Sequence, residues 1–121
     1  MIRKILFYLC LCLIVFFSII PQDVNSSLLS GMRFTKSGFF QHVAGYFVLS
    51  ALAWKSFAKN NIWIILAGIF IMSAGLEIVQ YVLPSRTFNI YDLLANLAGV
   101  LVVVLKILLS RAKTQRYQEN H

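Results

Sequence analysis

The chain has 121 residues, of which 60% are hydrophobic and only 12% are charged. Its apolar residues fall in long runs rather than in amphipathic periods, which excludes a soluble globular domain of this size. Lysines and arginines outnumber acidic residues 11 to 4, which gives a formal net charge of +7, but nothing in the basic segments resembles a nucleic-acid-binding module. The composition therefore predicts an integral membrane protein without a nucleic-acid partner.

Four apolar runs approach the length of about 20 residues with which a helix crosses the hydrocarbon core of a bilayer. They cover residues 5–20, 39–57, 62–83 and 90–109, and a basic tail follows at 110–121. The first run lacks the small-x-small cleavage site of a signal peptide, so we interpret it as an uncleaved helix. The sequence predicts an all-α fold, a bundle of four transmembrane helices in a single domain over residues 1–121.

Both cysteines of the chain, Cys10 and Cys12, lie in the first run. Two residues apart on a helix, they point to different sides, and the chain offers no further cysteine for a metal cluster or a disulfide framework. We interpret them as small apolar residues. The connection after this run, residues 21–38, is predicted to be a loop outside the membrane with one short surface helix around 28–34.

Positive charges are distributed unevenly between the two ends of the predicted bundle. Eight lie at the end that carries both termini: Arg3, Lys4, Lys55, Lys59, Lys106, Arg111, Lys113 and Arg116. The opposite end has three: Arg33, Lys36 and Arg86. By the positive-inside rule this asymmetry predicts that both termini are cytoplasmic, and a basic tail of this kind favours anionic lipid headgroups.

Polar side chains are predicted to gather at the opposite, extracytoplasmic end of the bundle. These are His42, Tyr46, Glu77, Gln80, Arg86, Asp92 and Asn96. Residues three or four apart share a helix face, which pairs Glu77 with Gln80 and Asp92 with Asn96. A carboxylate inside a membrane is costly unless it faces protein or water, so these residues are candidates for function.

The order and spacing of these residues resemble the VanZ-like family of small bacterial membrane proteins. The resemblance covers about residues 36–104 and rests on Lys36, His42, Glu77-x-x-Gln80, Pro84-x-Arg86 and Asp92-x-x-x-Asn96-x-x-Gly99. It implies a multi-pass protein of the bacterial cytoplasmic membrane. Some members lower susceptibility to teicoplanin, a glycopeptide antibiotic with a lipid tail, but the resemblance implies no settled biochemical activity.

Several of the polar candidates also have a purely structural interpretation. Asn89 and Asp92 fit the N-cap and N3 positions of a capping arrangement, which the helix dipole also favours. Arg86 can neutralise Glu77 or Asp92 without any chemistry. Gln80 is of the type that forms interhelical hydrogen bonds. These alternatives stay open at the level of the sequence.

Close helix packing accounts for a second set of residues. Asn96 is typical of interhelical hydrogen bonding, and Ala95 with Gly99 forms a small-xxx-small step that suits a tight helix interface. Gly68 and Gly75, seven residues apart on the third helix, are also expected to mark close packing rather than a hinge.

Two main classes of function fit the polar set. In a membrane enzyme that acts on a lipid headgroup or a lipid-linked envelope precursor, His42 would be the general base or nucleophile, and Glu77 or Asp92 would orient it or donate a proton. The substrate-binding residues would then be Lys36, Tyr46, Gln80, Arg86 and Asn96, with Arg86 on a phosphate. In a binding module or a structural scaffold, the same groups would hold a lipid or a lipid-tailed compound without any reaction.

Other functions have weaker support in the sequence. An ion or proton pathway suits intramembrane carboxylates, but transport sites are typically built from interrupted helices, and the four predicted helices are unbroken. A metal bound by His42, Glu77 and Asp92 is possible in kind, yet no spacing identifies one, so we assign no metal. No serine-elbow or phosphate-loop motif is present. The cofactor and the oligomeric state stay unknown.

Overall fold

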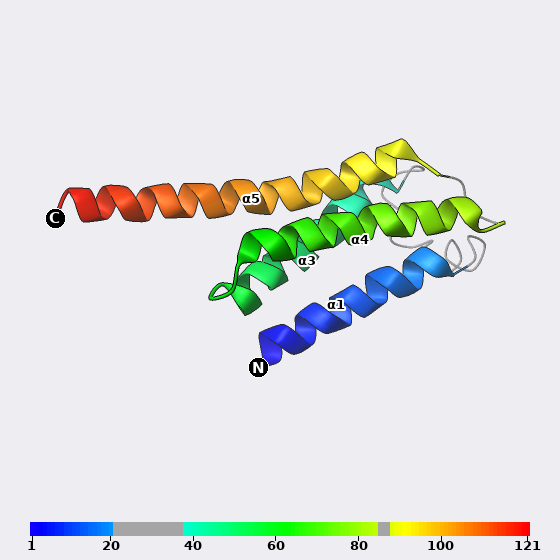
Figure 1. Cartoon of the computed structure of the whole chain (residues 1–121), viewed down its shortest axis with the longest axis horizontal. Helices are drawn as coiled ribbons and strands as arrows, with labels where there is room; N and C mark the ends of the chain where they lie inside the picture. The colour runs from blue at the N-terminus through cyan, green and yellow to red at the C-terminus, as the bar shows by residue number, and fades with distance from the viewer. Residues whose placement is uncertain (21–37, 85–87) are drawn as a thin grey trace.

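The structure is a computed structural model that describes residues 1–20, 38–84 and 88–121. This part of the chain forms four α-helices arranged as an elongated bundle (Figure 1). They are α1 (Ile2–Ile19), α3 (Phe39–Phe57), α4 (Ile62–Val82) and α5 (Ile90–Glu119). The all-α class and the four helices are confirmed. The surface helix predicted at 28–34, and the candidate residues Lys36 and Arg86, lie outside the described residues.

Three of the helices, α1, α4 and α5, are long and apolar enough to cross a membrane. The fourth, α3, is not in this set because polar residues such as Gln41 and His42 interrupt its apolar surface. It packs against all three other helices. Because protein covers much of α3, its surface can carry polar groups that a lipid-facing helix would not tolerate.

The first turns of α3 and α5 are fixed by local backbone chemistry. Gly38 precedes α3 with a φ of 66°, in the left-handed region that glycine adopts without strain. Its carbonyl oxygen accepts a hydrogen bond from the backbone N–H of His42, at 3.2 Å. At α5, the Asn89 side chain caps the helix by accepting from the Tyr91 N–H at 3.0 Å, as predicted. His42 and Asp92 therefore each lie in the first turn of their helix.

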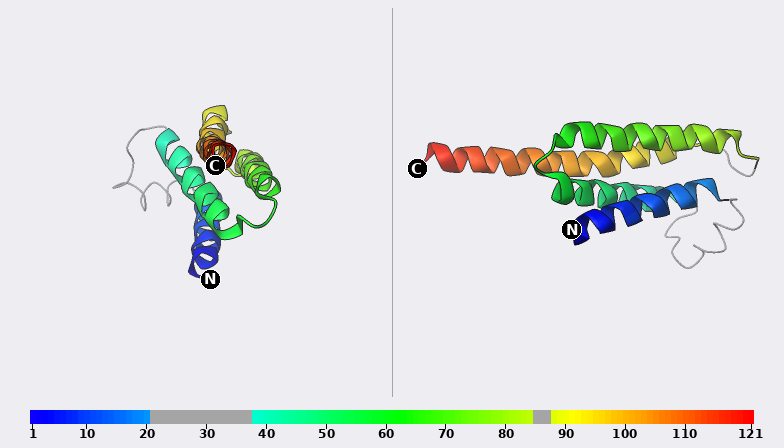
Figure 2. Two further views of the ribbon diagram at one scale, coloured as in Figure 1. Left: turned by 90° about the vertical axis from the view of Figure 1, so that its left-hand side faces the viewer. Right: turned by 60° about the horizontal axis from the view of Figure 1, so that its bottom comes forward.

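Both termini and the turn between α3 and α4 lie toward the same end of the bundle, and α5 extends beyond that turn (Figures 1 and 2). The eight cations assigned to one end by the sequence therefore belong to segments at this end, with those of α5 spread along the helix. The structure differs from the prediction in the length of α5, which continues as helix through residues predicted as a separate tail. The 30 residues of α5 span about 45 Å, about 15 Å more than a hydrocarbon core. No glycine or proline interrupts residues 110–119, so nothing in this segment breaks the helix.

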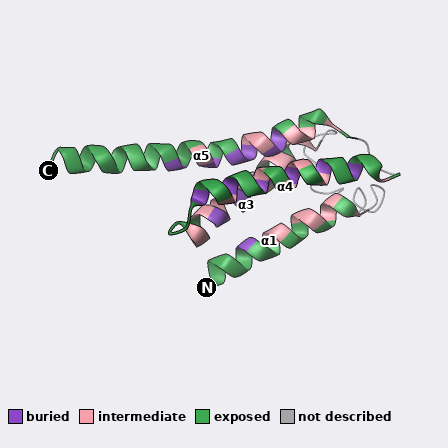
Figure 3. Cartoon of the chain, viewed as in Figure 1, coloured by how far each residue is buried: buried purple, intermediate pink, exposed green. Residues whose placement is uncertain are grey.

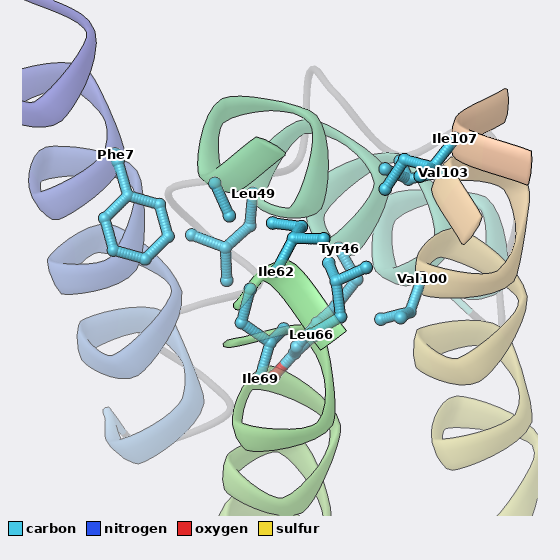
Figure 4. Packing of buried hydrophobic residues seen from close by; sticks show 10 residues of the cluster. Phe7, Tyr46, Leu49, Ile62, Leu66, Ile69, Val100, Val103 and Ile107 are labelled. Carbon is cyan, nitrogen blue, oxygen red and sulfur yellow. The ribbon is translucent and has the colours of Figure 1, made fainter. Parts of the chain in front are cut away.

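The tightest contact in the bundle lies between α3 and α5. A Cβ atom placed on Gly99 would come within 2.5 Å of the Val43 carbonyl oxygen and 2.8 Å of the Phe47 backbone nitrogen. Ala95, one turn earlier on α5, is completely buried. The predicted small-xxx-small interface is thus confirmed, because only small residues let two helix backbones approach so closely. Figure 4 shows side chains of α5, including Val100, packed beside those of α3 and α4.

The prediction for the other two glycines was wrong. Gly68 and Gly75 are exposed, and a Cβ atom on either would meet nothing within 4 Å among the described residues. They lie on the outer face of α4 rather than at a helix crossing. Because α4 is apolar on nearly all sides, hydrophobic pattern alone does not identify which of its faces is buried.

Helix α1 packs more loosely than the others. Phe7 is its one buried residue and contacts the Phe57 ring edge-to-face, with ring centroids 5.3 Å apart. Figure 3 shows α1 as mostly exposed or half-buried, whereas the central part of α5 carries a buried stripe. The core of the bundle is therefore built from α3, α4 and α5, and α1 lies against its side.

Candidate functional site

His42 connects α3 to α5 through two side chains. Its Nδ1 lies 2.8 Å from the Asn96 Oδ1, and its Nε2 lies 3.9 Å from the Asp92 Oδ2. The first distance is a hydrogen bond, and the second is too long for a direct one but short enough for an ion pair when the ring is protonated. Three of the predicted site residues therefore meet at this interface.

The close crossing at Gly99 explains why Asn96 reaches His42. Asn96 lies almost one turn before Gly99 on the same face of α5, and His42 directly precedes Val43, whose carbonyl approaches Gly99. With the amide in this orientation, Nδ1 carries a proton and donates to the Asn96 oxygen. Asn96 is only 1% exposed, and its predicted interhelical hydrogen bond is present.

The second group of predicted residues lies between α3 and α4. Glu77 is 2% exposed and Tyr46 is 4% exposed, and the carboxylate interacts electrostatically with the Tyr46 phenol. Tyr46 follows His42 by one turn on α3, so both side chains share a face. The α3 helix thus links the two groups, with His42 turned toward α5 and Tyr46 close to Glu77.

Gln80 has a clear structural role. Its side-chain Nε2 donates to the backbone carbonyl of Ser18 at 3.0 Å. The last carbonyls of a helix have no intrahelical partner, and Ser18 is in the last turn of α1. Gln80 therefore satisfies a helix end and joins α1 to α4. The predicted interhelical hydrogen bond of Gln80 is real, but its partner is a backbone atom that no sequence pattern identifies.

A cavity of about 220 Å³ lies between α1, α3 and α4. Its described apolar wall comes mainly from α1, with Leu13, Ile14 and Phe17 beside the half-buried thiol of Cys10. Gly45 contributes to the α3 side, and a Cβ atom there would lie 4.0 Å from the Ile14 Cδ1. The cavity is therefore an apolar space against the loosely packed helix.

The polar lining of the same cavity comes from the candidate site. Its polar members are Ser18, Gln41, His42, Tyr46 and Gln80. The combination of apolar walls with a few polar groups is typical of small-molecule sites. The sequence missed Ser18, Gln41 and Gly45. Gln41 had a usable signal, because it is a polar residue beside His42 in an otherwise apolar helix start.

The described residues form no grouping of three or more His, Cys, Asp or Glu side chains that could hold a metal ion. Glu77 and Asp92 both lie near α3, but Glu77 is associated with Tyr46 and Asp92 with His42. The chemistry that the described site offers is hydrogen bonding through amides, a phenol and an imidazole, with two carboxylates close by.

Comparison with known proteins gives one clear result. The sequence profile of the VanZ/LLP1 family matches residues 4–111, which is most of the chain. Separate comparisons with curated proteins and with solved structures found no match. The match begins in α1 and ends in α5, so it includes every element that lines the cavity. The chain belongs to the VanZ/LLP1 family.

Proposed function

We propose that this protein binds an envelope lipid or a lipid-linked compound at the outer end of its bundle, as a multi-pass protein of the bacterial cytoplasmic membrane. The single observation that carries the proposal is the cavity between α1, α3 and α4, which combines an apolar wall with the polar groups of His42, Tyr46 and Gln80. A ligand with an apolar chain and a polar head matches this arrangement in chemistry.

The size of the cavity suits binding of part of a lipid rather than of a complete molecule. Its volume of about 220 Å³ is below the range of roughly 300–1,000 Å³ that is usual for sites enclosing a whole small molecule. The rest of the ligand would remain in the bilayer beside α1. The same reasoning supports a proposed link to lipid-tailed glycopeptides such as teicoplanin, since their tail has the required apolar character.

Binding without a reaction is supported by the orientation of His42. Both ring nitrogens are directed at side chains of α5, Nδ1 at Asn96 and Nε2 at Asp92. A nucleophile or general base needs a nitrogen within hydrogen-bond reach of the reacting group. His42 is therefore better suited to fixing the polar end of the cavity, where Gln41, Tyr46 and Gln80 supply the polar groups that face a ligand head.

The two cysteines provide a direct test of the cavity. Cys10 lines it, whereas Cys12 is exposed on another side of α1. Two variants isolate the thiols: Cys12→Ser retains Cys10, and Cys10→Ser retains Cys12. The rate of maleimide labelling is measured for each in detergent, first alone and then with a bacterial polar lipid extract or teicoplanin. We expect the additions to slow labelling of Cys10 several-fold and to leave Cys12 unchanged. Equal rates with and without every addition would contradict the proposal.

A pair of glycine substitutions serves as the matched control. Gly45→Leu would fill the cavity beside Ile14, because the position has ordinary contact distance. Gly75→Leu adds the same side chain where the described structure leaves open space. Protection of Cys10 by an added ligand should disappear in Gly45→Leu and persist in Gly75→Leu. Protection that survives in Gly45→Leu would place the ligand elsewhere.

An enzyme is the second candidate, favoured by the His42 and Asp92 pair. A carboxylate 3.9 Å from an imidazole nitrogen resembles the orienting pair of a general base, and such contacts are often long before substrate binds. Mass spectrometry of membrane lipids from cells that express the parent or His42→Gln would distinguish the two. A modified lipid present only with the parent selects the enzyme.

The proposed orientation has its own test. With both termini cytoplasmic, tags fused to either end should be inaccessible in intact cells. A cysteine placed at Ser26, in the loop between the first and second predicted helices, should react with an impermeant reagent. Labelling of a C-terminal tag in sealed cells would reverse the orientation and place the cavity's polar groups on the cytoplasmic side.

A further inference from the structure

We propose that the basic end of the bundle, the end that carries the eight lysines and arginines, binds the headgroups of anionic phospholipids, and that Arg111 forms its principal phosphate contact. This surface lies at the opposite end from the cavity's polar groups. It stands on separate observations and does not depend on the proposed function.

Charge is strongly one-sided at this end. The described acidic side chains are Glu77, Asp92 and Glu119, and the first two belong to the candidate site at the other end of the bundle. Glu119 lies at the far tip of α5. Cations from α1, from the turn between α3 and α4 and from α5 therefore lie at an end of the bundle with little described negative charge. Such a region attracts the net-negative surface of an anionic membrane.

Aromatic rings hold some of these cations in place. The Arg111 guanidinium lies over the Trp63 ring at 5.2 Å, and the Lys4 ammonium lies over Phe57 at 5.5 Å. A guanidinium that rests on a ring keeps its N–H edges available, and those edges match phosphate oxygens bidentately. Arg111 is thus ordered before any ligand arrives, which lowers the entropic cost of binding.

The position of Arg111 along α5 matches the depth of a headgroup. Arg111 follows Ile90, the first residue of α5, by a length of about 32 Å at 1.5 Å per residue. The hydrocarbon core is about 30 Å thick. A helix that enters the core at Ile90 therefore presents Arg111 at the opposite interface. Trp63, in the first turn of α4, belongs to the same layer, where tryptophan is usually enriched.

Native mass spectrometry of the purified full-length protein in detergent tests the proposal. Phosphatidylglycerol and phosphatidylcholine are titrated separately, and bound lipid is counted at each concentration. We expect phosphatidylglycerol to bind at lower concentration than phosphatidylcholine, and inorganic phosphate not to compete with it. Equal binding of the two lipids, or displacement by inorganic phosphate, would overturn the proposal.

Arg111→Gln and Arg116→Gln form a matched pair, because each removes one positive charge from α5 and only Arg111 has a described aromatic contact. We expect Arg111→Gln to weaken phosphatidylglycerol binding by about tenfold, as loss of a charge-assisted hydrogen bond does. Arg116→Gln should cost about fivefold or less, the effect of one cation near a surface. Trp63→Leu, which retains the charge, should give an intermediate loss. Equal losses of affinity in the two arginine variants, with unchanged melting in lipid-free detergent, would show that Arg111 contributes only its charge and makes no specific phosphate contact.

Discussion

The two interfaces of α3 have opposite characters. Toward α5, backbone approaches backbone at Gly99, and a hydrogen bond between the buried Asn96 and His42 joins the helices. Toward α1, only Phe7 is buried on the partner helix, and a cavity of about 220 Å³ remains between them. One side of α3 is therefore closely packed, and the other contains space.

This difference in packing gives the two interfaces different roles: the α3–α5 contact holds the structure together, and the α1 side can accommodate a ligand. Close packing leaves few alternative arrangements, because interiors at native density respond to even small changes in volume. The α3–α5 contact thus fixes His42 relative to Asp92 and Asn96. The long apolar side chains of α1, such as Leu13 and Phe17, can instead adjust to a ligand chain by changing rotamers. A site that combines rigid polar groups with an adaptable apolar wall suits ligands that share a headgroup and differ in chain.

The largest effect should come from adding one methyl group to the tight interface. In Gly99→Ala the new Cβ would lie 2.5 Å from the Val43 carbonyl oxygen, so the two helices must separate. We expect the free energy of unfolding in detergent to fall by about 3 kcal/mol, the upper part of the usual range for overpacking. The measurement is thermal or denaturant unfolding followed by circular dichroism.

Gly75→Ala is the control for that experiment, because its Cβ meets nothing within 4 Å among the described residues. Its stability should stay the same or rise by up to about 1 kcal/mol, since alanine favours helix over glycine. Parental stability in Gly99→Ala would mean that the α3–α5 interface tolerates expansion and that the two sides of α3 do not differ as described.

The contrast between the interfaces also shows how far the sequence leads. Long apolar runs were sufficient to predict the four helices and their order, because a helix that crosses a bilayer must be long and hydrophobic, and both properties are visible in the sequence. The spacing of Ala95 and Gly99 identified the tight crossing. The end of α5 was not predicted, since a basic segment of good helix formers carries no stop signal. The prediction of close packing at Gly68 and Gly75 was wrong, because small residues indicate close packing only where they face another helix.

The site was predictable to a similar degree. Helical spacing alone placed Asp92 and Asn96 on one face, and the structure turns both toward His42. The division into one group at α5 and another at α4 depends on helix rotation, which spacing does not supply. The contribution of α1 was missed, because most of its cavity-lining residues are ordinary apolar side chains and its hydrogen bond to Gln80 uses the Ser18 backbone carbonyl.

A second prediction measures the polar part of the tight interface. Asn96→Ala should lower the free energy of unfolding by about 1 kcal/mol, the usual size of an interhelical hydrogen bond in a membrane protein. In a double-mutant cycle with His42→Ala, the coupling energy should be about 0.5–1.5 kcal/mol. A coupling energy near zero would show that the 2.8 Å contact contributes nothing to stability.

A smaller effect is expected on the loose side of α3. Gln80→Leu removes the hydrogen bond to the Ser18 carbonyl while keeping a side chain of similar size. We expect a stability loss of about 0.5 kcal/mol, near the average for such bonds in membranes, together with faster hydrogen exchange at the C-terminal end of α1. If α1 exchanges no faster in this variant, then Gln80 does not anchor that helix. Ser73→Ala is a control, because the Ser73 hydroxyl donates to the Phe70 carbonyl within α4 itself.

The smallest effect on stability, with the largest on function, is predicted for Glu77. Its side chain is 2% exposed and interacts with Tyr46, which lines the cavity. Glu77→Gln preserves shape and most hydrogen-bonding capacity but removes the negative charge and the capacity to transfer a proton. A carboxylate so far inside an apolar helix is costly, and such residues usually serve function rather than folding. We therefore expect Glu77→Gln to insert and melt like the parent.

Function is expected to change in Glu77→Gln even though folding does not. In a binding module the variant should lose the ligand protection of Cys10 labelling; in an enzyme it should lose the modified lipid. Ser73→Ala provides the comparison, because Ser73 lies one turn earlier on α4 and is completely buried. Within the described part of the chain its hydroxyl donates to the Phe70 carbonyl of its own helix. That variant should keep both stability and ligand protection. A Glu77→Gln protein that is well expressed, stable and fully protected by ligand would show that the charge at this position has no part in binding. The polar role would then fall to Tyr46 and the amides around the cavity.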